Sequence, residues 1–461
     1  MSTIAYNNIE IKPYNLNSFQ DLKIVKKLNE HGTIYFKGIV PEEEKDKYVE
    51  MTEVGTNLEV DCIDETSNRI SLFKGIVTNI EIKMVMGIYY IEVEGMSHTY
   101  NLDIKLKKRS FQNAGMRYGK LIEEVTAPYS GVDFIDTVSD GKCLEKCVVQ
   151  YDETDWEFLK RMASHFNAAL IPEFSANKTK FWFGPPKGEE VGQLEDFNYS
   201  ISKKIGNFRS SSENYNKSIE ENDFIYYKIE TDRILNIGDS VSFKDKKLYV
   251  FQATATMQDS ILKHEYILSP KNGLTQDLVL NNKIKGTSIE GRVIGISGDT
   301  VKVHLQIDEN QSSGEAYAFP YSTPYTAEGN TGMYCMPEMG DSVKVYFPTN
   351  KEEEGIVINS IRRSDGGLPD PGVKMFRTSS GKEIKFTDGE ITISANGAVI
   401  TISDSGIQIS GGGVSISGGS ISLNAGTITV SAKDSIGLKC KASEIQMSGE
   451  TSIKGSKVRN N

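Results

Sequence analysis

Histidine and cysteine, the side chains that most often build catalytic and metal sites, are scarce in this sequence. Its 461 residues include five histidines and five cysteines. The histidines are isolated from one another, and only Cys143 and Cys147 are near neighbours, at a spacing that matches neither a C-x-x-C motif nor half of a zinc site. We therefore expect buried free thiols, no metal site and no cofactor.

An excess of positive charge and long apolar segments are also lacking. The 63 acidic residues outnumber the 52 basic ones, which gives a net charge of -11, so the overall field does not attract a phosphate backbone and we expect no nucleic-acid partner. No apolar run approaches the ~20 residues that span a bilayer, and the first residues lack the basic and apolar regions of a signal peptide. The sequence predicts a multidomain protein made in the cytoplasm without a signal peptide.

A short repeat that begins at Ile384 is the strongest pattern in the sequence. Doublets of the form apolar-polar-apolar recur every seven to nine residues, and most are separated by turns that contain glycine. A spacing of two places both apolar side chains of a doublet on one face of a strand, while the residue between them faces the other way. The doublets are Ile384/Phe386, Ile391/Ile393, Ile400/Ile402, Ile407/Ile409, Val414/Ile416, Ile421/Leu423, Ile428/Val430, Ile436/Leu438 and Ile445/Met447.

Strands this short and frequent cannot enclose their own apolar stripe. A solenoid wound from one chain needs roughly 20 or more residues per coil. Three copies wound around one axis would bury the stripe and pair every strand edge, so we predict an intertwined triple-stranded β-helix in a homotrimer over residues 384–461. A disordered Gly/Ser-rich tail, a two-sided meander and an adhesin-like solenoid are the alternatives. The predicted trimer core consists of Ile391, Ile393, Ile400, Ile402, Ile407, Ile409, Val414, Ile416, Ile421, Leu423, Ile428, Val430, Ile436 and Leu438.

The segment that precedes this repeat has the pattern of a small barrel. Residues 287–363 contain alternating strands at 291–296, 300–305, 342–347 and 354–361, with turns such as Gly298-Asp299. This pattern predicts a five-stranded OB-fold domain. Residues 364–383 are rich in glycine and proline and are predicted to form a linker.

Residues 1–286 are predicted to be mostly β, with one clear helix. Thr154 followed three residues later by Glu157 forms a capping box that starts this helix. The helix carries a single apolar stripe made of Trp156, Leu159, Met162, Ala163 and Phe166.

Two segments resemble the valine-glycine-repeat (VgrG) spike proteins and the spikes of contractile phages. Residues 333–345 contain the turn Pro-Glu-x-Gly-Asp-x-Val, which that family has in an OB domain directly above a trimeric β-helix. Residues 151–163 resemble the family's hub signature, an aromatic residue, an acidic cluster and Phe-Leu-x-Arg. The resemblance implies a hub barrel I at 1–110, an α+β insert at 111–180 and a hub barrel II at 181–286, whose halves form a pseudo-sixfold ring in the trimer.

The resemblance also implies a function. It indicates a structural hub and membrane-piercing spike at the tip of the tail tube of a contractile injection system, either a phage tail or a phage-tail-like bacteriocin, with a type VI secretion spike as the alternative. The chain would be assembled into a tail or extracellular particle. Its partners would be the tail tube protein, baseplate proteins and the target cell envelope, and the repeat would end in a blunt polar tip or carry a separate spike-tip protein.

An enzyme is disfavoured by the spacing of these segments. Only 22 residues separate Ile361 from Ile384, too few for the inserted catalytic domain of a cell-wall-degrading tail enzyme. No histidine follows His304, so the axial His-x-His iron site that some spikes carry cannot form. A receptor-binding fibre would need a globular tip domain, which the sequence lacks. We therefore predict a structural protein with no catalytic residues.

Overall fold

The computed structural model describes residues 4–63, 67–195, 198–215, 219–325, 331–362, 370–447, 449 and 456–457. The chain forms two compact units, 1–363 and 364–461. The predicted mostly β fold is confirmed, with 45% of residues in strands and 14% in helices. No helix within the described ranges is long and apolar enough to cross a membrane. The parts of the predicted linker and spike at 364–369, 448, 450–455 and 458–461 lie outside the described residues.

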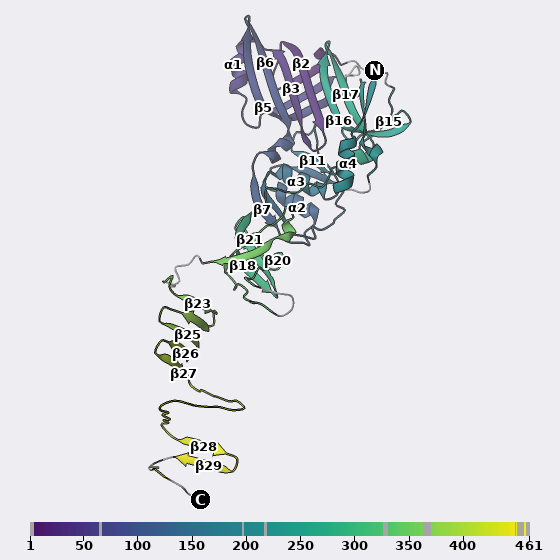
Figure 1. Cartoon of the computed structure of the whole chain (residues 1–461). Helices are drawn as coiled ribbons and strands as arrows, with labels where there is room; N and C mark the ends of the chain where they lie inside the picture. The colour runs from purple at the N-terminus through teal and green to yellow at the C-terminus, as the bar shows by residue number, and fades with distance from the viewer. Residues whose placement is uncertain are drawn as a thin grey trace. The chain divides into compact units, whose positions relative to one another are not determined.

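Twelve strands of the first unit form one sheet (Figure 1). Its main path runs β1-β4-β5-β6-β3-β2-β16-β17-β14-β13, with β15 attached to β16 and β12 attached to β15. Because β2 pairs with β16, the strands of the two predicted hub barrels share this sheet. The strands are β1 (Ile9–Lys12), β2 (Ser18–Lys27), β3 (Glu30–Ile39), β4 (Asn57–Ile63), β5 (Arg69–Val85), β6 (Ile88–Ser97), β12 (Glu190–Gln193), β13 (Tyr199–Lys203), β14 (Ile225–Thr231), β15 (Ser240–Phe243), β16 (Lys246–Gln258) and β17 (Ile261–Ser269).

Two apolar cores lie along this one sheet. The first is built mainly from alternating residues of β2–β6, among them Leu22 and Phe36, and helix α1 (Lys45–Glu50) adds Tyr48 to it. The second is built mainly from β14–β17 and includes Val250 and Tyr266. Helix α4 (Ile205–Asn214) lies on the surface of this second half and is largely exposed. Each of the two predicted halves therefore has its own core within a continuous sheet.

The chain between the two halves folds into an α+β body with a third core. It contains β7 (Lys107–Phe111) paired with β9 (Val148–Glu153), and a three-stranded sheet of β10 (Leu170–Pro172), β11 (Lys180–Phe183) and β8 (Asp133–Asp136). Helices α2 (Tyr118–Thr126) and α3 (Asp155–Ser164) pack in this core.

The predicted helix is confirmed as α3, and its capping box is formed. The backbone N–H of Glu157 donates to Thr154 Oγ1 at 3.1 Å, and the backbone N–H of Thr154 donates to Glu157 Oε2 at 3.1 Å. The predicted stripe is buried at Trp156, Leu159, Met162 and Ala163, and Phe166 is partly buried beside it.

Residues 288–361 form a separate five-stranded sheet with the order β20-β19-β18-β21-β22. A parallel bridge between Tyr321 and Val357 joins the chain after β20 to β22, so the two edges of the sheet meet. Its core contains Val293, Phe319 and Phe347. The strands are β18 (Ser288–Ser297), β19 (Thr300–Leu305), β20 (Ala318–Pro320), β21 (Ser342–Tyr346) and β22 (Ile356–Ile361).

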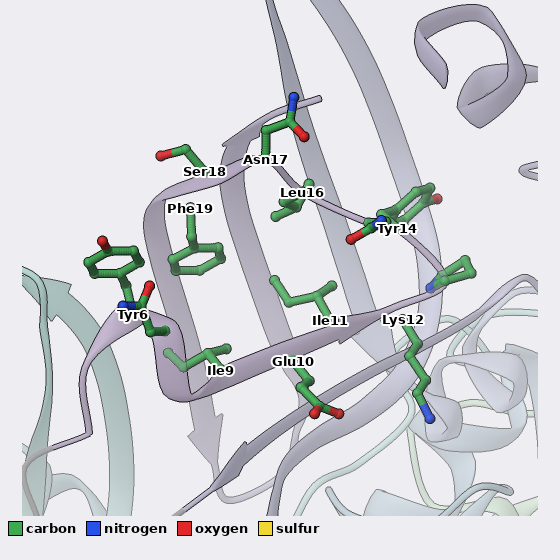
Figure 2. A pocket seen from close by; sticks show the side chains of 13 residues that line it. Tyr6, Ile9, Glu10, Ile11, Lys12, Tyr14, Leu16, Asn17, Ser18 and Phe19 are labelled. Carbon is green, nitrogen blue, oxygen red and sulfur yellow. The ribbon is translucent and has the colours of Figure 1, made fainter. Parts of the chain in front are cut away.

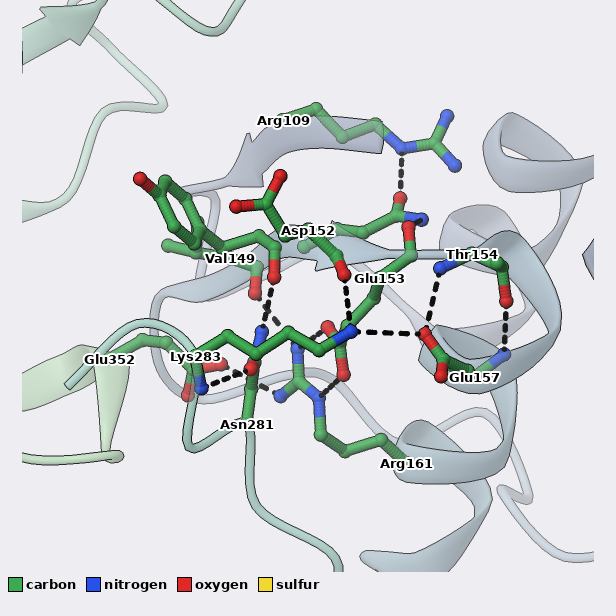
Figure 3. Close-up of polar contacts among 12 residues, drawn as sticks. Arg109, Val149, Asp152, Glu153, Thr154, Glu157, Arg161, Asn281, Lys283 and Glu352 are labelled. Atoms are coloured by element: carbon green, nitrogen blue, oxygen red, sulfur yellow. Dashed lines mark hydrogen bonds and ion pairs between the residues drawn. The ribbon is translucent and has the colours of Figure 1, made fainter. Parts of the chain in front are cut away.

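A buried ion cluster fastens this sheet to the α+β body. Arg161, the last residue of the Phe-Leu-Lys-Arg motif on α3, is 1% exposed and donates from Nε and Nη2 to both carboxylate oxygens of Glu153 at 2.8 Å. Its Nη1 donates to Glu352 Oε1 at 2.7 Å, just before β22, and its Nη2 also donates to the carbonyl oxygen of Val149 (Figure 3). The buried guanidinium of Arg161 is therefore paired and hydrogen-bonded to one carboxylate from each side of the joint.

The chain that connects the second hub half to β18 is tied to the same body. Asn281 Nδ2 donates to the carbonyl oxygen of Tyr151 at 2.9 Å, and Lys283 Nζ donates to that of Asp152 at 2.6 Å (Figure 3). Because these contacts satisfy backbone groups with side chains, an irregular segment is held in a fixed path.

The second unit begins with a five-stranded antiparallel meander, β23-β24-β25-β26-β27. Strand β23 lies inside the range 364–383 that was predicted to be a linker, because Lys374–Arg377 pairs with β24, so the strands start earlier than predicted. Residues 411–435, all of them described, contain no strand, although three doublets were predicted there. The strands are β23 (Lys374–Arg377), β24 (Glu383–Phe386), β25 (Glu390–Ala395), β26 (Ala398–Ser403), β27 (Gly406–Ser410), β28 (Ile436–Cys440) and β29 (Ser443–Met447).

No disulfide links the five cysteines, all of which lie in the described ranges, as predicted. Cys62 and Cys147 are buried, and burial raises the pKa of the Cys147 thiol well above its ordinary value. The expectation of burial is wrong for Cys440, which is exposed at the end of β28. None of the described His, Cys, Asp and Glu residues form a group that could hold a metal ion.

Candidate functional site: the apolar face of the C-terminal strands

The predicted doublets lie in register across the meander of the second unit. Ile391 pairs with Ile402 and Ile393 with Ile400 across β25 and β26, and Ile400 pairs in turn with Ile409 across β26 and β27. Ile402 pairs with Ile407. Because side chains alternate along a strand, these paired residues form two adjacent apolar rows on one face of the sheet.

The opposite face of the same sheet is polar. The residues between the doublets form their own row, in which Lys385 pairs with Thr392, Thr392 with Thr401, and Thr401 with Gln408. The sheet therefore has one polar face and one apolar face, as the spacing of the doublets predicted.

The apolar face is uncovered in the single chain. Ile393, Ile400 and Ile402 are about two-fifths exposed, and Ile407 is 69% exposed. None of the predicted trimer-core residues is buried. An exposed, contiguous apolar face on an ordered sheet is typical of a surface that another polypeptide covers.

The next three predicted doublets lack a backbone partner as well as apolar cover. Val414, Ile416, Ile421, Leu423, Ile428 and Val430 are between 53% and 73% exposed. The repeat then returns to paired strands, where Leu438 on β28 pairs with Ile445 on β29. The structure thus brings together the predicted residues of β25–β27, and separately those of β28 and β29, but not those between them.

Phe376 belongs to the apolar face and was missed by the sequence analysis. It lies on β23, is 48% exposed and pairs with Ile384. Its spacing of eight residues from Ile384 falls within the seven-to-nine range of the repeat. The signal was therefore present, but Phe376 has no apolar partner two residues away that would complete a doublet.

A pocket at the edge of the first unit does not assemble catalytic groups from the residues described. It has a volume of about 500 Å³ and lies between β1 and the segment that leads into β2 (Figure 2). Its apolar side is formed by Ile9, Ile11 and Phe19, whereas Glu10 points away from Phe19 and pairs with Arg69 (Figure 2). Acid–base chemistry needs groups that converge on one point, and this pocket has none among its charged side chains.

The structure therefore defines a class of fold: a continuous two-core sheet with an α+β insert, a small five-stranded sheet and a C-terminal unit with one apolar face. No protein-family model and no curated protein sequence matches the chain.

Solved structures match this fold. The E. coli c3393 protein, a type VI secretion component described as similar to the T4 bacteriophage tail proteins gp27 and gp5, is 12% identical and matches 77% of this chain and 99% of its own, with a TM-score of 0.55. A chain of the half-lidded Francisella PdpA–VgrG complex is 10% identical and matches 89% of this chain and 88% of its own, with a TM-score of 0.56. A chain of the lidded form of that complex is 10% identical and matches 89% of this chain and 80% of its own, with a TM-score of 0.58. At this level of identity the likeness establishes the fold, and it confirms the predicted resemblance to VgrG-like hub-and-spike proteins.

Proposed function

We propose that this protein is the structural hub and membrane-piercing spike at the tip of the tail tube of a contractile injection system, and that it acts as a homotrimer without catalytic activity. Contraction of an outer sheath drives the tube and spike into a target envelope. Its setting is a phage tail or a phage-tail-like bacteriocin, and a type VI secretion spike is the alternative. The tube protein, baseplate proteins and the target envelope are its partners, in a tail or extracellular particle.

One observation carries the proposal: the uncovered apolar face of the C-terminal strands. Covering the exposed half of an isoleucine is worth about 1 kcal/mol, and the repeat contains more than a dozen exposed isoleucine, valine, leucine and phenylalanine side chains. Residues 411–435 need backbone partners in addition to apolar cover. Three copies wound around one axis as an intertwined β-helix supply both, whereas a dimer of stacked sheets would cover the apolar face and leave these residues unpaired.

The five-stranded sheet of residues 288–361 is proposed to be an OB-type barrel that connects hub and spike. The antiparallel order β20-β19-β18-β21-β22 with a parallel closure between Tyr321 and Val357 supports a small closed barrel. Its attachment through the buried Arg161 cluster supports a connector that transmits force rather than a mobile binding module.

The mass of the purified full-length protein in solution tests the trimer. Light scattering or sedimentation should give about 154 kDa, three times the 51.2 kDa of one chain. A folded monomer or dimer would contradict the proposed homotrimer. Release of soluble fragments from purified peptidoglycan by the trimer would instead identify a wall-degrading enzyme.

A further inference from the structure

The hairpin between β5 and β6 ends in an apolar tip. Met84, Val85, Met86 and Ile88 are all exposed, and Met86 is 98% exposed. The ladder between β3 and this hairpin ends at Ile39, opposite Tyr90, and one further backbone hydrogen bond joins Val40 to Tyr89, so the tip extends beyond β3 (Figure 1). A cluster of apolar side chains at the end of a projecting hairpin is unusual on a soluble surface and points to a contact.

The backbone of this turn makes the choice of methionine informative. Met86 has a φ of 52° and Gly87 a φ of 80°, and the two lie between the paired residues Val85 and Ile88. Two positive φ angles define a type I′ turn, in which the first central position favours Asn, Asp or Gly. The sequence instead has a large apolar side chain at a strained position, which indicates that the side chain serves something other than the turn.

The tip lies at the end of the sheet that faces away from the α+β insert. The insert contacts the opposite end, where the indole nitrogen of Trp156 donates to the carbonyl oxygen of Asn29. Ile88 and Ser97, at the two ends of β6, are about 30 Å apart at the usual rise of a strand. A partner reached by Met86 must therefore be stacked on the end of the hub, residues 1–286, that is remote from the insert.

A second hairpin reaches the same end but is polar. The turn between β16 and β17 contains Asp259 and Ser260, both at positive φ, and β16 pairs with β2 so that this turn points away from Lys27 and the insert. The two halves of the hub thus present different tips, one apolar and one polar, to the same side.

We propose that residues 84–88 are an anchor that inserts into apolar sockets on the ring of tube subunits stacked on this end of the hub. This inference rests on the proposed function. A trimer would offer three apolar tips and three polar tips, so only three sockets around the ring would be filled. The contact would fix the rotation of the ring on the hub.

The charges of the hairpin stem favour a protein partner over a lipid surface. Lys83 is paired with Glu81 at 2.9 Å and with Glu92 at 3.0 Å, and Lys37 is paired with the same Glu92 at 2.9 Å. Binding to anionic lipid needs free basic groups around an apolar tip, whereas these lysines are engaged and the chain carries a net charge of -11.

Site-specific photocrosslinking in assembled particles tests the anchor. A photoreactive amino acid replaces Met86 in one variant and Ser260 in the control, and particles are purified from the producing cells before irradiation. We expect an adduct at position 86 that contains peptides of the tube subunit. An adduct with lipid, an adduct with a second copy of this chain, or no adduct from particles that contain the hub would each overturn the anchor.

A substitution separates docking from folding. Met86→Asn suits the turn, so the purified protein should keep its mass and melt at the same or a higher temperature. Particles carrying it should lose the hub from the tube at least tenfold faster in a dilution and sedimentation assay, whereas Asp259→Asn should not change the rate. Equal rates for both variants overturn the anchor alone, whereas a monomeric protein or one absent from particles overturns the proposed function.

Discussion

Replacing Ile407 with serine should separate the three chains while the hub stays folded. Ile407 is 69% exposed in the single chain and lies on the apolar face, paired with Ile402. Full burial of an isoleucine is worth about 1.5–3 kcal/mol, so covering the exposed share contributes roughly 1–2 kcal/mol per chain and roughly 3–6 kcal/mol for three chains. Since every 1.4 kcal/mol is a factor of ten, the association constant should fall by roughly 10² to 10⁴.

Gln408→Ser is the matched control for this substitution. Gln408 is the next residue on the same strand and faces the polar side. Serine at this position therefore changes the strand propensity of the same strand without changing the apolar face. Sedimentation across a dilution series measures the trimer fraction, and circular dichroism reports whether the hub remains folded. If both variants shift the trimer equally, or neither does, the apolar face is not the association surface and the reasoning fails.

Three further predictions concern the hub. Arg161→Met leaves Glu153 and Glu352 buried without a cation, so the free energy of unfolding in urea should fall by about 3–5 kcal/mol, and a loss below 1 kcal/mol would contradict a tightly closed joint. Burial, with Lys146 and Arg161 nearby, lowers the pKa of His165 to about 3 from an ordinary 6.5. The stability that this neutral histidine contributes is complete above pH 6.5 and is lost as the pH falls toward 3, so His165→Phe should flatten the decline of stability in that range, and an unchanged slope would show that other groups control it. Met86→Asn should raise the unfolding free energy by about 0.5–1 kcal/mol because asparagine tolerates positive φ, and a lower value would mean that the methionine packs within the hub.

Local signals in the sequence were sufficient for α3 and for the apolar rows. The pair Thr154 and Glu157 lies within one turn of helix, and its capping box forms as predicted. The doublets of β25–β27 need only the alternation of a strand to share a face. Helix α2 was not predicted although Leu121, Ile122 and Val125 have helical spacing, because its 9 residues are shorter than the window over which helical periodicity is distinctive.

Contacts between distant segments could not be predicted from patterns. Arg161 was matched to a motif, but its bond to Glu352 joins residues 191 positions apart, and no local rule selects that carboxylate. The pairing of β2 with β16 is equally remote, and it joins strands of the two predicted hub barrels in one sheet. The absence of strands at 411–435 has another cause, since the doublets there have no partner within their own chain. The intertwined β-helix and the homotrimer stay predictions.

The seam between β2 and β16 has a consequence for how the chain is made. Lys27 pairs with Gln252, so 225 residues must follow Lys27 out of the ribosome before β2 gains its second neighbour. At about 5–20 residues per second this takes roughly 11–45 seconds, during which one long edge of the nascent sheet is open to solvent. Slow synthesis or crowded ribosomes should therefore favour cross-pairing between unfinished chains, and a chaperone that shields β2 should raise the yield of soluble protein.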